Sequence, residues 1–166
     1  MTFVPPVSSV VPVPSVPSVP SVSSVRTVSL TLMNARSGRI VASAIELALT
    51  RSARNQGLLN RTGLDPASAL VLAPCFMIHT ASMRFPIDVI FVDRSGRVVR
   101  IVRDLRSWRI AGSLAAYATI ELAAGALASR DVVVGDHLYL DTVADPGSLV
   151  NRQRSFSSAL DGLRTS

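Results

Sequence analysis

Residues 87–102 read IDVIFVDRSGRVVRIV, and this stretch decides the fold. Its two ends are rich in β-branched and aromatic residues, and each run is too short and continuous for an amphipathic helix. The residues between them suit a turn, with Gly96 fitted to a left-handed backbone conformation. The stretch therefore predicts a β-hairpin with strands at 87–93 and 97–104.

Asp88 places a charge inside the first of these strands, where an apolar residue is expected. Burying an ionised group without a partner costs several kcal/mol, so something must hold this carboxylate. The preceding segment, residues 74–86, offers Arg84 and His79, together with the only cysteine of the chain, Cys75. We expect Asp88 to be held by Arg84, His79 or backbone amides.

Apolar alternation and turn residues predict a mainly β protein along the rest of the domain. Thr50 is a candidate N-cap for a short helix, and Gly57 is a candidate residue for its C-terminal end. Together these patterns predict a single-domain antiparallel β-sandwich or barrel-like sheet with one short helix near residues 51–57. Strands are expected at 28–33, 39–48, 69–73, 87–93, 97–104, 117–122 and 137–142, with a hairpin turn over 34–38.

The two ends of the chain differ in composition from the middle. The first 25 residues carry no charge and contain six of the ten prolines, with a tandem Pro-Ser-Val repeat at 14–22. Such a segment favours polyproline II and interrupts any membrane span or secretory signal. We predict a disordered leader over 1–25, a β-sandwich domain over 26–145, and a flexible tail over 146–166, whose serine content favours disorder over a terminal helical turn.

All seventeen basic residues are arginine, and the net charge is +6. Base composition of the genome explains this bias as well as a polyanion-binding surface does. Arginine recurs every third residue from Arg94 to Arg109, and on a strand this odd spacing divides the side chains between two faces. No helix-turn-helix, zinc-finger or RNP pattern is visible, so nucleic-acid binding is expected to be weak and non-specific.

Several short patterns occur along the domain. They are Ala53-Arg54, Gly57-Leu58-Leu59 with Arg61, Pro74-Cys75 with Ile78-His79-Thr80, Met83 to Val89, Phe91, Asp93, Gly96, Trp108-Arg109, Glu121-Leu122 with Gly125, and Gly135-Asp136. Together they resemble the domain-of-unknown-function 192 family, also called uncharacterised protein family 0127. The resemblance spans residues 28–142 and implies a compact, mostly antiparallel β-sandwich without an established activity. This chain differs from the family pattern at Asn60, at Ala81-Ser82 and at Ser107, which affects local loop shape.

Cys75, His79 and Asp88 are the candidate residues for catalysis. A cysteine and a histidine four residues apart on a strand are about 13 Å apart at the backbone, too far to activate a thiolate unless the segment bends. With one cysteine and two histidines, a metal site lacks ligands, and none of the common cofactor motifs is present. We therefore predict neither a metal nor a cofactor, and the single cysteine favours a cytoplasmic location.

These observations favour a binding module for a small polar ligand or a partner peptide, recognised through the loop and strand from His79 to Asp88. A hydrolase-like enzyme using Cys75, His79 and Asp88 is the alternative, and a weak, non-specific polyanion binder is the third reading. No membrane span is expected. The family pattern groups several of the candidate ligand-binding residues, which are His79, Thr80, Met83, Arg84, Asp88, Trp108 and Glu121.

Overall fold

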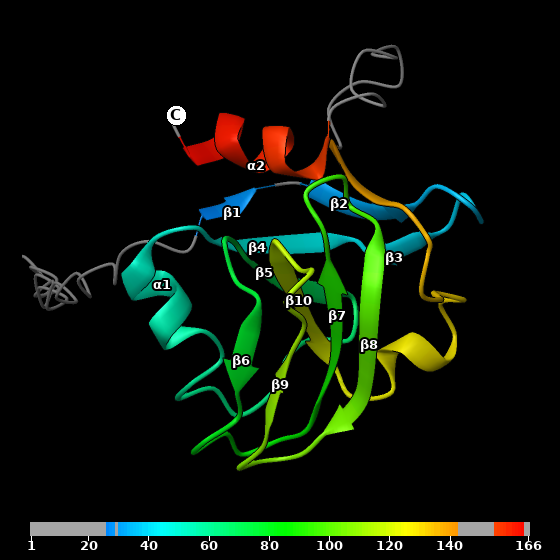
Figure 1. Ribbon diagram of the computed structural model, residues 1–166. Helices are drawn as coiled ribbons and strands as arrows, with labels where there is room; N and C mark the ends of the chain where they lie inside the picture. The colour runs from blue at the N-terminus through cyan, green and yellow to red at the C-terminus, as the bar shows by residue number, and fades with distance from the viewer. Residues whose placement is uncertain (1–25, 29, 143–154, 165–166) are drawn as a thin grey trace, which may run out of the picture.

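The computed structural model describes residues 26–28, 30–142 and 155–164, and Figure 1 shows its arrangement. The fold is mainly β without a closed barrel, which confirms the predicted fold class. The leader over 1–25 lies outside the described residues. The six-stranded sheet has the order β1 (Arg26–Val28), β4 (Ala44–Ala48), β5 (Ser68–Leu72), β10 (Ala118–Ala123), β7 (Ile87–Val92) and β8 (Val98–Leu105).

Two smaller sheets and three helical segments complete the described fold. The three-stranded sheet has the order β11 (Leu138–Thr142), β2 (Leu30–Asn34) and β3 (Ile40–Ala42), and the two-stranded sheet pairs β6 (Met77–His79) with β9 (Ile110–Gly112). The helical segments are α1 (Arg51–Gln56), the 3-10 helix η1 (Ala126–Ala128) and α2 (Phe156–Arg164). Sequence patterns predicted neither β9 nor η1.

The strand expected over 39–48 is two strands that belong to different sheets. β3 pairs with β2, whereas β4 pairs with β1 and β5. Between them, Ser43 leaves the ladder, and its backbone N–H donates to the carbonyl of Ala67 at 2.9 Å. The apolar alternation continues across this break, which is why the sequence alone suggests one strand.

One strand pair in the large sheet is parallel, within a sandwich that was expected to be mostly antiparallel. β4 and β5 run in the same direction, from Ala44 opposite Ser68 to Ala48 opposite Leu72. A parallel pair requires a crossover connection, and α1 lies within it. The Thr50 side chain accepts a hydrogen bond from the Ala53 N–H at 3.1 Å, so the predicted N-cap is confirmed.

The large sheet buries a hydrophobic cluster on each of its faces, so β7 is buried along its whole length. Alternate residues of β7 supply the two clusters, with Ile90 and Val92 on one side and Val89 and Phe91 on the other. The three-stranded sheet and α2 cover the first face. The β6–β9 ribbon and the turn after α1 cover the second face, which is where the candidate site lies.

The predicted hairpin over 87–102 is present as β7 and β8. Its turn closes with the Asp93 side chain accepting from the N–H groups of Ser95 and Arg97, at 2.8 and 3.0 Å. Gly96 has the positive φ expected, at 92°.

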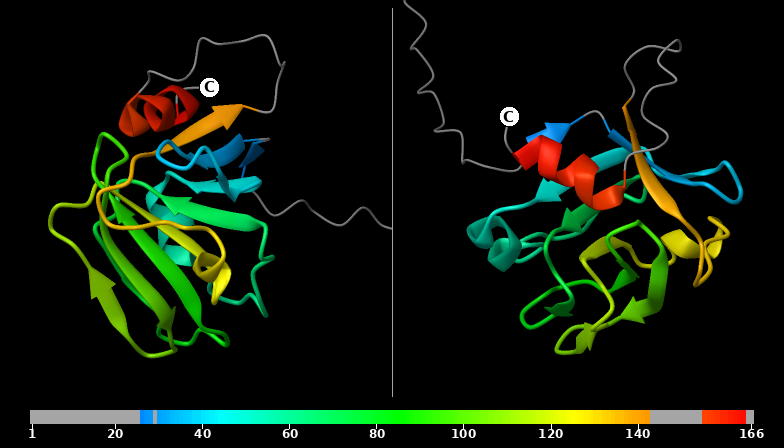
Figure 2. Two further views of the ribbon diagram at one scale, coloured as in Figure 1. Left: turned by 90° about the vertical axis from the view of Figure 1, so that its right-hand side faces the viewer. Right: turned by 45° about the horizontal axis from the view of Figure 1, so that its top comes forward.

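α2 occupies part of the segment that was expected to be a flexible tail. Phe156 and Leu160 are each only 1% exposed and belong to the first hydrophobic cluster. The helix begins beside the β7–β8 turn, where the Ser157 N–H donates to the Arg94 carbonyl at 3.0 Å. Figure 2 shows the helix lying beside β11. The serine-rich composition of this segment predicted disorder, and only the spacing of its apolar residues indicated a buried helix face.

Candidate functional site

A cavity of about 300 Å³ opens between α1, the turn that follows it, and the segment leading into β6. Its apolar wall contains the buried side chains of Leu58, Leu72 and Ile78. Two hydrogen bonds attach the segment that precedes β6 to the beginning of β10. The Cys75 N–H donates to the Tyr117 carbonyl at 2.8 Å, and the Thr119 hydroxyl donates to the Cys75 carbonyl at 3.0 Å. The remaining lining residues are Arg54, Asn55, Gln56, Gly57, Leu59, Pro74, Cys75, Phe76, Met77, His79 and Glu121.

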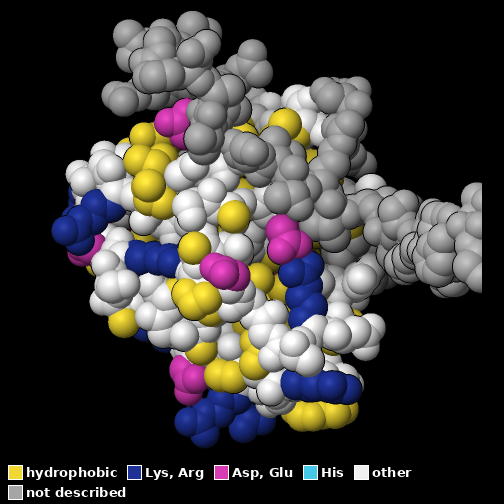
Figure 3. All heavy atoms as spheres, turned by 180° about the vertical axis from the view of Figure 1, so that it is seen from behind, with side chains coloured by type: hydrophobic (Ala, Val, Ile, Leu, Met, Phe, Trp, Pro, Cys, Tyr) yellow, Lys and Arg dark blue, Asp and Glu magenta, His cyan; other side chains and the backbone are white. Residues whose placement is uncertain are grey.

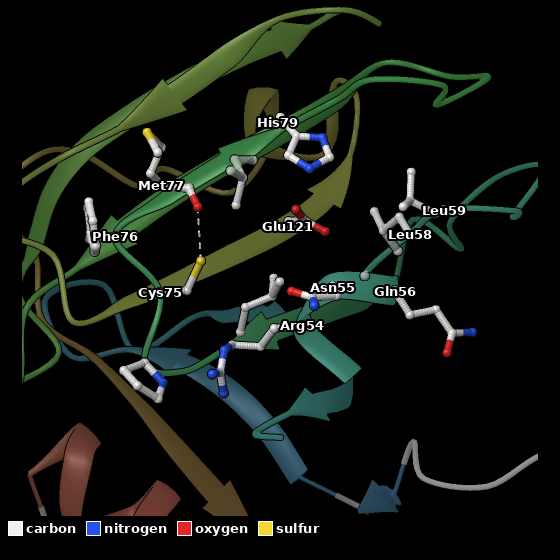
Figure 4. Close-up of a pocket in the computed structure, with 14 residues that line it drawn as sticks. Arg54, Asn55, Gln56, Leu58, Leu59, Cys75, Phe76, Met77, His79 and Glu121 are labelled. Carbon is white, nitrogen blue, oxygen red and sulfur yellow. Dashed lines mark hydrogen bonds between the residues drawn. The ribbon is translucent and has the colours of Figure 1, made fainter. Parts of the chain in front are cut away.

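Glu121 is the buried carboxylic acid of this cavity. It comes from β10, opposite Leu70 of β5 and Val89 of β7, and its residue is 4% exposed. Its Oε2 atom is buried and has no hydrogen-bond partner within the part of the chain that the structure describes. Figure 4 shows the carboxyl between the side chains of His79 and Asn55, with Cys75 to one side. A buried acceptor without a partner is costly, so this atom is the polar feature of the site that most needs a ligand.

Burial raises the pKa of Glu121 to about 7, and the positive charge of Arg61 opposes this shift. The two guanidinium groups of this region bind other acceptors. Arg61 forms a bidentate pair with Glu46, at 2.9 and 2.7 Å, and Arg54 donates to the carbonyls of Leu49 and Ala73, at 2.7 and 3.2 Å. Neither cation therefore supplies the hydrogen bond that Glu121 lacks.

Of the other predicted site residues, the structure places only His79 in this cavity. His79 is exposed at the end of β6, and its neighbour Ile78 points inward. Cys75, the proposed nucleophile of the hydrolase alternative, also lines the cavity and is half-buried, with its thiol directed at the Met77 carbonyl at 3.3 Å.

Asp88 lies on the opposite face of the sheet from this cavity. It pairs with Leu122 of β10, whose side chain belongs to the first hydrophobic cluster. Its carboxylate accepts the N–H groups of Asp104 and Leu127, each at 3.0 Å. The sequence allowed Arg84, His79 or backbone amides as partners of this carboxylate, and the structure shows backbone amides. Asp88 therefore orders two chain segments and is not brought together with Cys75 and His79.

Thr80, Met83, Arg84 and Trp108 lie outside the cavity lining. Thr80 is fully buried, and its hydroxyl contacts the Arg106 carbonyl at 2.6 Å and the Arg109 N–H at 2.9 Å, so it joins the β6 end to the turn before β9. Met83 is buried in the second hydrophobic cluster. Arg84 is exposed, and Trp108 is 70% exposed with a positive φ of 61°.

Sequence reasoning missed the contribution of α1 and the turn after it. Asn55, Gln56 and Leu59 line the cavity, yet nothing in their local pattern differs from an ordinary short helix. Glu121, by contrast, was among the expected residues, and it is also an acidic residue inside an apolar strand. Within the residues described, no group of three or more histidine, cysteine, aspartate or glutamate side chains is placed to hold a metal ion.

Two solved structures are similar to this chain. One is a protein from Sinorhizobium meliloti described as a "putative transcription regulator", with a TM-score of 0.63 and 26% identity, covering 71% of this chain and 96% of that one. The other is a protein of unknown function from Novosphingobium aromaticivorans, with a TM-score of 0.61 and 24% identity, covering 75% and 92%. The second likeness concerns the fold alone.

A comparison with curated proteins gives no match. A family model, by contrast, matches residues 32–140, which include every strand of the six-stranded sheet except β1 and all residues of the cavity. That model is DUF192, described as "Uncharacterized ACR". The predicted resemblance is thereby confirmed, and the chain belongs to the DUF192 family.

Proposed function

We propose that this protein is a binding module whose ligand is a small molecule with a polar group, held in the cavity between α1 and β6. The observation that carries the proposal is the buried, unpartnered Oε2 of Glu121 in the wall of that cavity. Apolar side chains around a few polar groups, which here include Asn55 and His79 as well as Glu121, are typical of small-ligand sites. A volume of about 300 Å³ is at the small end of the range for such sites.

The proposal retains His79 and Glu121 from the residues expected to bind ligand. It does not retain Asp88, Thr80 or Met83, whose observed contacts are with the protein itself. The hydrolase alternative needs Asp88 as the acid that orients His79. Asp88 lies on the opposite face of the sheet from the cavity, so this alternative loses that acid.

A fragment titration monitored by amide chemical shifts tests the proposal. We expect small alcohols, amides, amines or carboxylic acids to perturb amides in residues 54–59, 75–79 and 121. Asn55→Trp should abolish these shifts because the indole would occupy the cavity, whereas Arg51→Trp should not. Both positions are exposed on α1, but Arg51 does not line the cavity. Shifts confined to other regions, or no shifts with any fragment, would overturn the proposal.

Weak polyanion binding is the second candidate. It is supported by the description of the Sinorhizobium meliloti protein and by exposed arginines from Arg94 to Arg109. On the face seen in Figure 3, arginine side chains are dispersed among hydrophobic and neutral ones and do not form a continuous basic surface. Because the three-residue spacing of the arginines from Arg94 to Arg109 also divides them between two faces of a strand, we expect duplex DNA to bind weakly and to dissociate as salt rises. Fluorescence anisotropy at two salt concentrations tests this, and submicromolar binding that persists at about 200 mM salt would contradict it.

A further inference from the structure

We infer that the ligand group recognised in the cavity is a primary ammonium, bound to Glu121 and attached to a compact apolar body. This inference rests on the proposed small-ligand function and specifies the chemistry of its ligand. It follows from three features of the described residues: the unpartnered acceptor, the positions of the nearby cations, and the apolar wall.

The acceptor lacks a donor among the described residues. Glu121 Oε2 is shielded from water and accepts no hydrogen bond, so a ligand N–H or O–H directed at it would supply a missing bond. A charged donor forms the stronger bond with a carboxylate. A primary ammonium is compact and carries three rotatable donors, so it can bond to one carboxylate oxygen without the two-oxygen geometry that a guanidinium prefers.

The charged and titratable groups around Glu121 leave a place for a cation. His79 lies on β6, and Cys75 lies in the segment before it. Arg54 lies on α1, Arg61 follows the turn after α1, and Glu46 lies on β4. Arg61 is paired with Glu46, and Arg54 is bonded to two backbone carbonyls. The carboxyl of Glu121 is thus the acid in this group without a hydrogen-bonded counterion among the described residues.

The rest of the wall indicates what the ammonium is attached to. Leu58, Leu72 and Ile78 are buried on the cavity side of the sheet, and Met77 and Phe76 are half exposed at its edge. A ligand with an aryl or alkyl body adjoining its ammonium would place its charge at Glu121 and its apolar part against these side chains.

Binding of an ammonium to Glu121 is coupled to loss of the proton from its carboxyl. Glu121 is largely protonated below pH 7, because its pKa is raised to about 7. An ammonium pairs with the ionised form, so its binding must displace the proton from the carboxyl. Affinity for an ammonium should therefore rise with pH up to about 7 and then level off, whereas a ligand that accepts a hydrogen bond from the protonated acid should show the opposite dependence.

The experiment compares benzylamine with benzyl alcohol and benzoate, which share one ring and differ in the polar group. We expect benzylamine to bind most tightly, with its affinity falling by up to about tenfold per pH unit below pH 7. Calorimetry in buffers of different ionisation enthalpy should show proton release near pH 6. Glu121→Gln should weaken benzylamine by about tenfold or more, while Asp104→Asn, an equivalent change on an exposed side chain outside the cavity, should leave the affinity unchanged.

The outcomes separate this inference from the function on which it rests. If benzyl alcohol or benzoate binds in the cavity at least as tightly as benzylamine, the ammonium assignment fails and the binding module stands. If no probe perturbs the cavity amides, both fail. Should Glu121→Gln not fold, the pH dependence of wild-type binding decides alone, and an affinity for benzylamine that does not rise from pH 5 to pH 7 overturns the inference.

Discussion

Asp88 and Glu121 are acidic residues on adjacent strands, one position out of register, and their side chains lie on opposite faces of the sheet. Glu121 pairs with Val89, and Asp88 pairs with Leu122. The carboxylate of Asp88 is satisfied by two backbone amides, whereas Oε2 of Glu121 has no partner among the described residues. Asp88 therefore contributes to the scaffold, and Glu121 is the acid on which the proposed ligand site depends.

The buried acid makes folding stability depend on pH near neutrality. Unfolded glutamate ionises near 4.5, but Glu121 in the folded protein keeps its proton up to about pH 7. The folded state therefore binds more protons between these values, and stability should fall as pH rises from 4.5 to 7. At about 1.4 kcal/mol per pKa unit, the loss is about 3 kcal/mol. Urea melts across this range should show it.

Glu121→Gln supplies the matched comparison for that pH effect. It replaces the ionisable group with a neutral amide of the same shape, so the Glu121 contribution to the slope should vanish. Asp104→Asn should retain the wild-type slope, because Asp104 is exposed and paired only with Arg106. Equal slopes in wild type and Glu121→Gln would show that Glu121 ionises normally.

Asp88→Asn should be clearly destabilising, and His79→Ala should be mild. The amide would place a donor against one of the two N–H groups that Asp88 accepts, leaving a buried donor without its partner at a cost of about 1–3 kcal/mol. His79 is exposed at the cavity edge, so truncating it should change the free energy of unfolding by less than about 0.5 kcal/mol. Denaturant melts of the two variants measure the contrast, and a His79→Ala cost as large as that of Asp88→Asn would make the histidine structural.

Gly96→Ala should destabilise the protein much more than Gly38→Ala does. Both glycines have positive φ, at 92° and 65°. A Cβ at Gly96 would also clash with the Leu138 carbonyl and press on Phe156 of α2, whereas a Cβ at Gly38 would meet nothing nearby. We expect a cost of about 3 kcal/mol at Gly96 and about 1 kcal/mol at Gly38. Similar thermal shifts for the two variants would contradict the contact between the β7–β8 turn and β11.

Asp136 should contribute to stability against acid. Its carboxylate accepts Arg36 Nε at 2.6 Å, Asn34 Nδ2 at 2.8 Å and the Val133 N–H at 3.0 Å. The Arg36 bond is the largest cause that lowers the pKa of Asp136 to about 2, from 3.8. Its stabilisation is therefore complete above pH 3.8 and is lost as pH falls toward 2. Asp136→Asn should lower stability at pH 7 and flatten the acid limb of an unfolding titration, and an unchanged limb would refute this assignment.

The sequence predicted what depends on local pattern. Alternation in residues 87–102 and turn chemistry at Gly96 were enough for the β7–β8 hairpin, and the Thr50 cap was enough for the start of α1. The break at Ser43 was not predictable because both sides keep the same alternation while pairing with different sheets.

The candidate site was predicted only in part, for a physical reason. His79 and Asp88 stood out as polar residues in apolar surroundings, whereas Glu121 was named only through the family resemblance. Only tertiary structure decides which face of the sheet Asp88 and Glu121 occupy. The cavity itself depends on how α1 and its following turn pack against β6, and short exposed helices such as α1 carry little pattern that reveals their neighbours.

The position of β10 has a consequence for the order of folding. It lies between β5 and β7, so the β4–β5 pair and the β7–β8 hairpin join only across residues 118–123. The β4–β5 pair and the β7–β8 hairpin can each form from nearby chain segments. The six-stranded sheet is complete only when β10 pairs with both of them, and this non-local step slows folding. Glu121 arrives with that strand. A molecule in which β10 had not yet paired would lack the acid of the cavity, so ligand binding would report that β10 is in place.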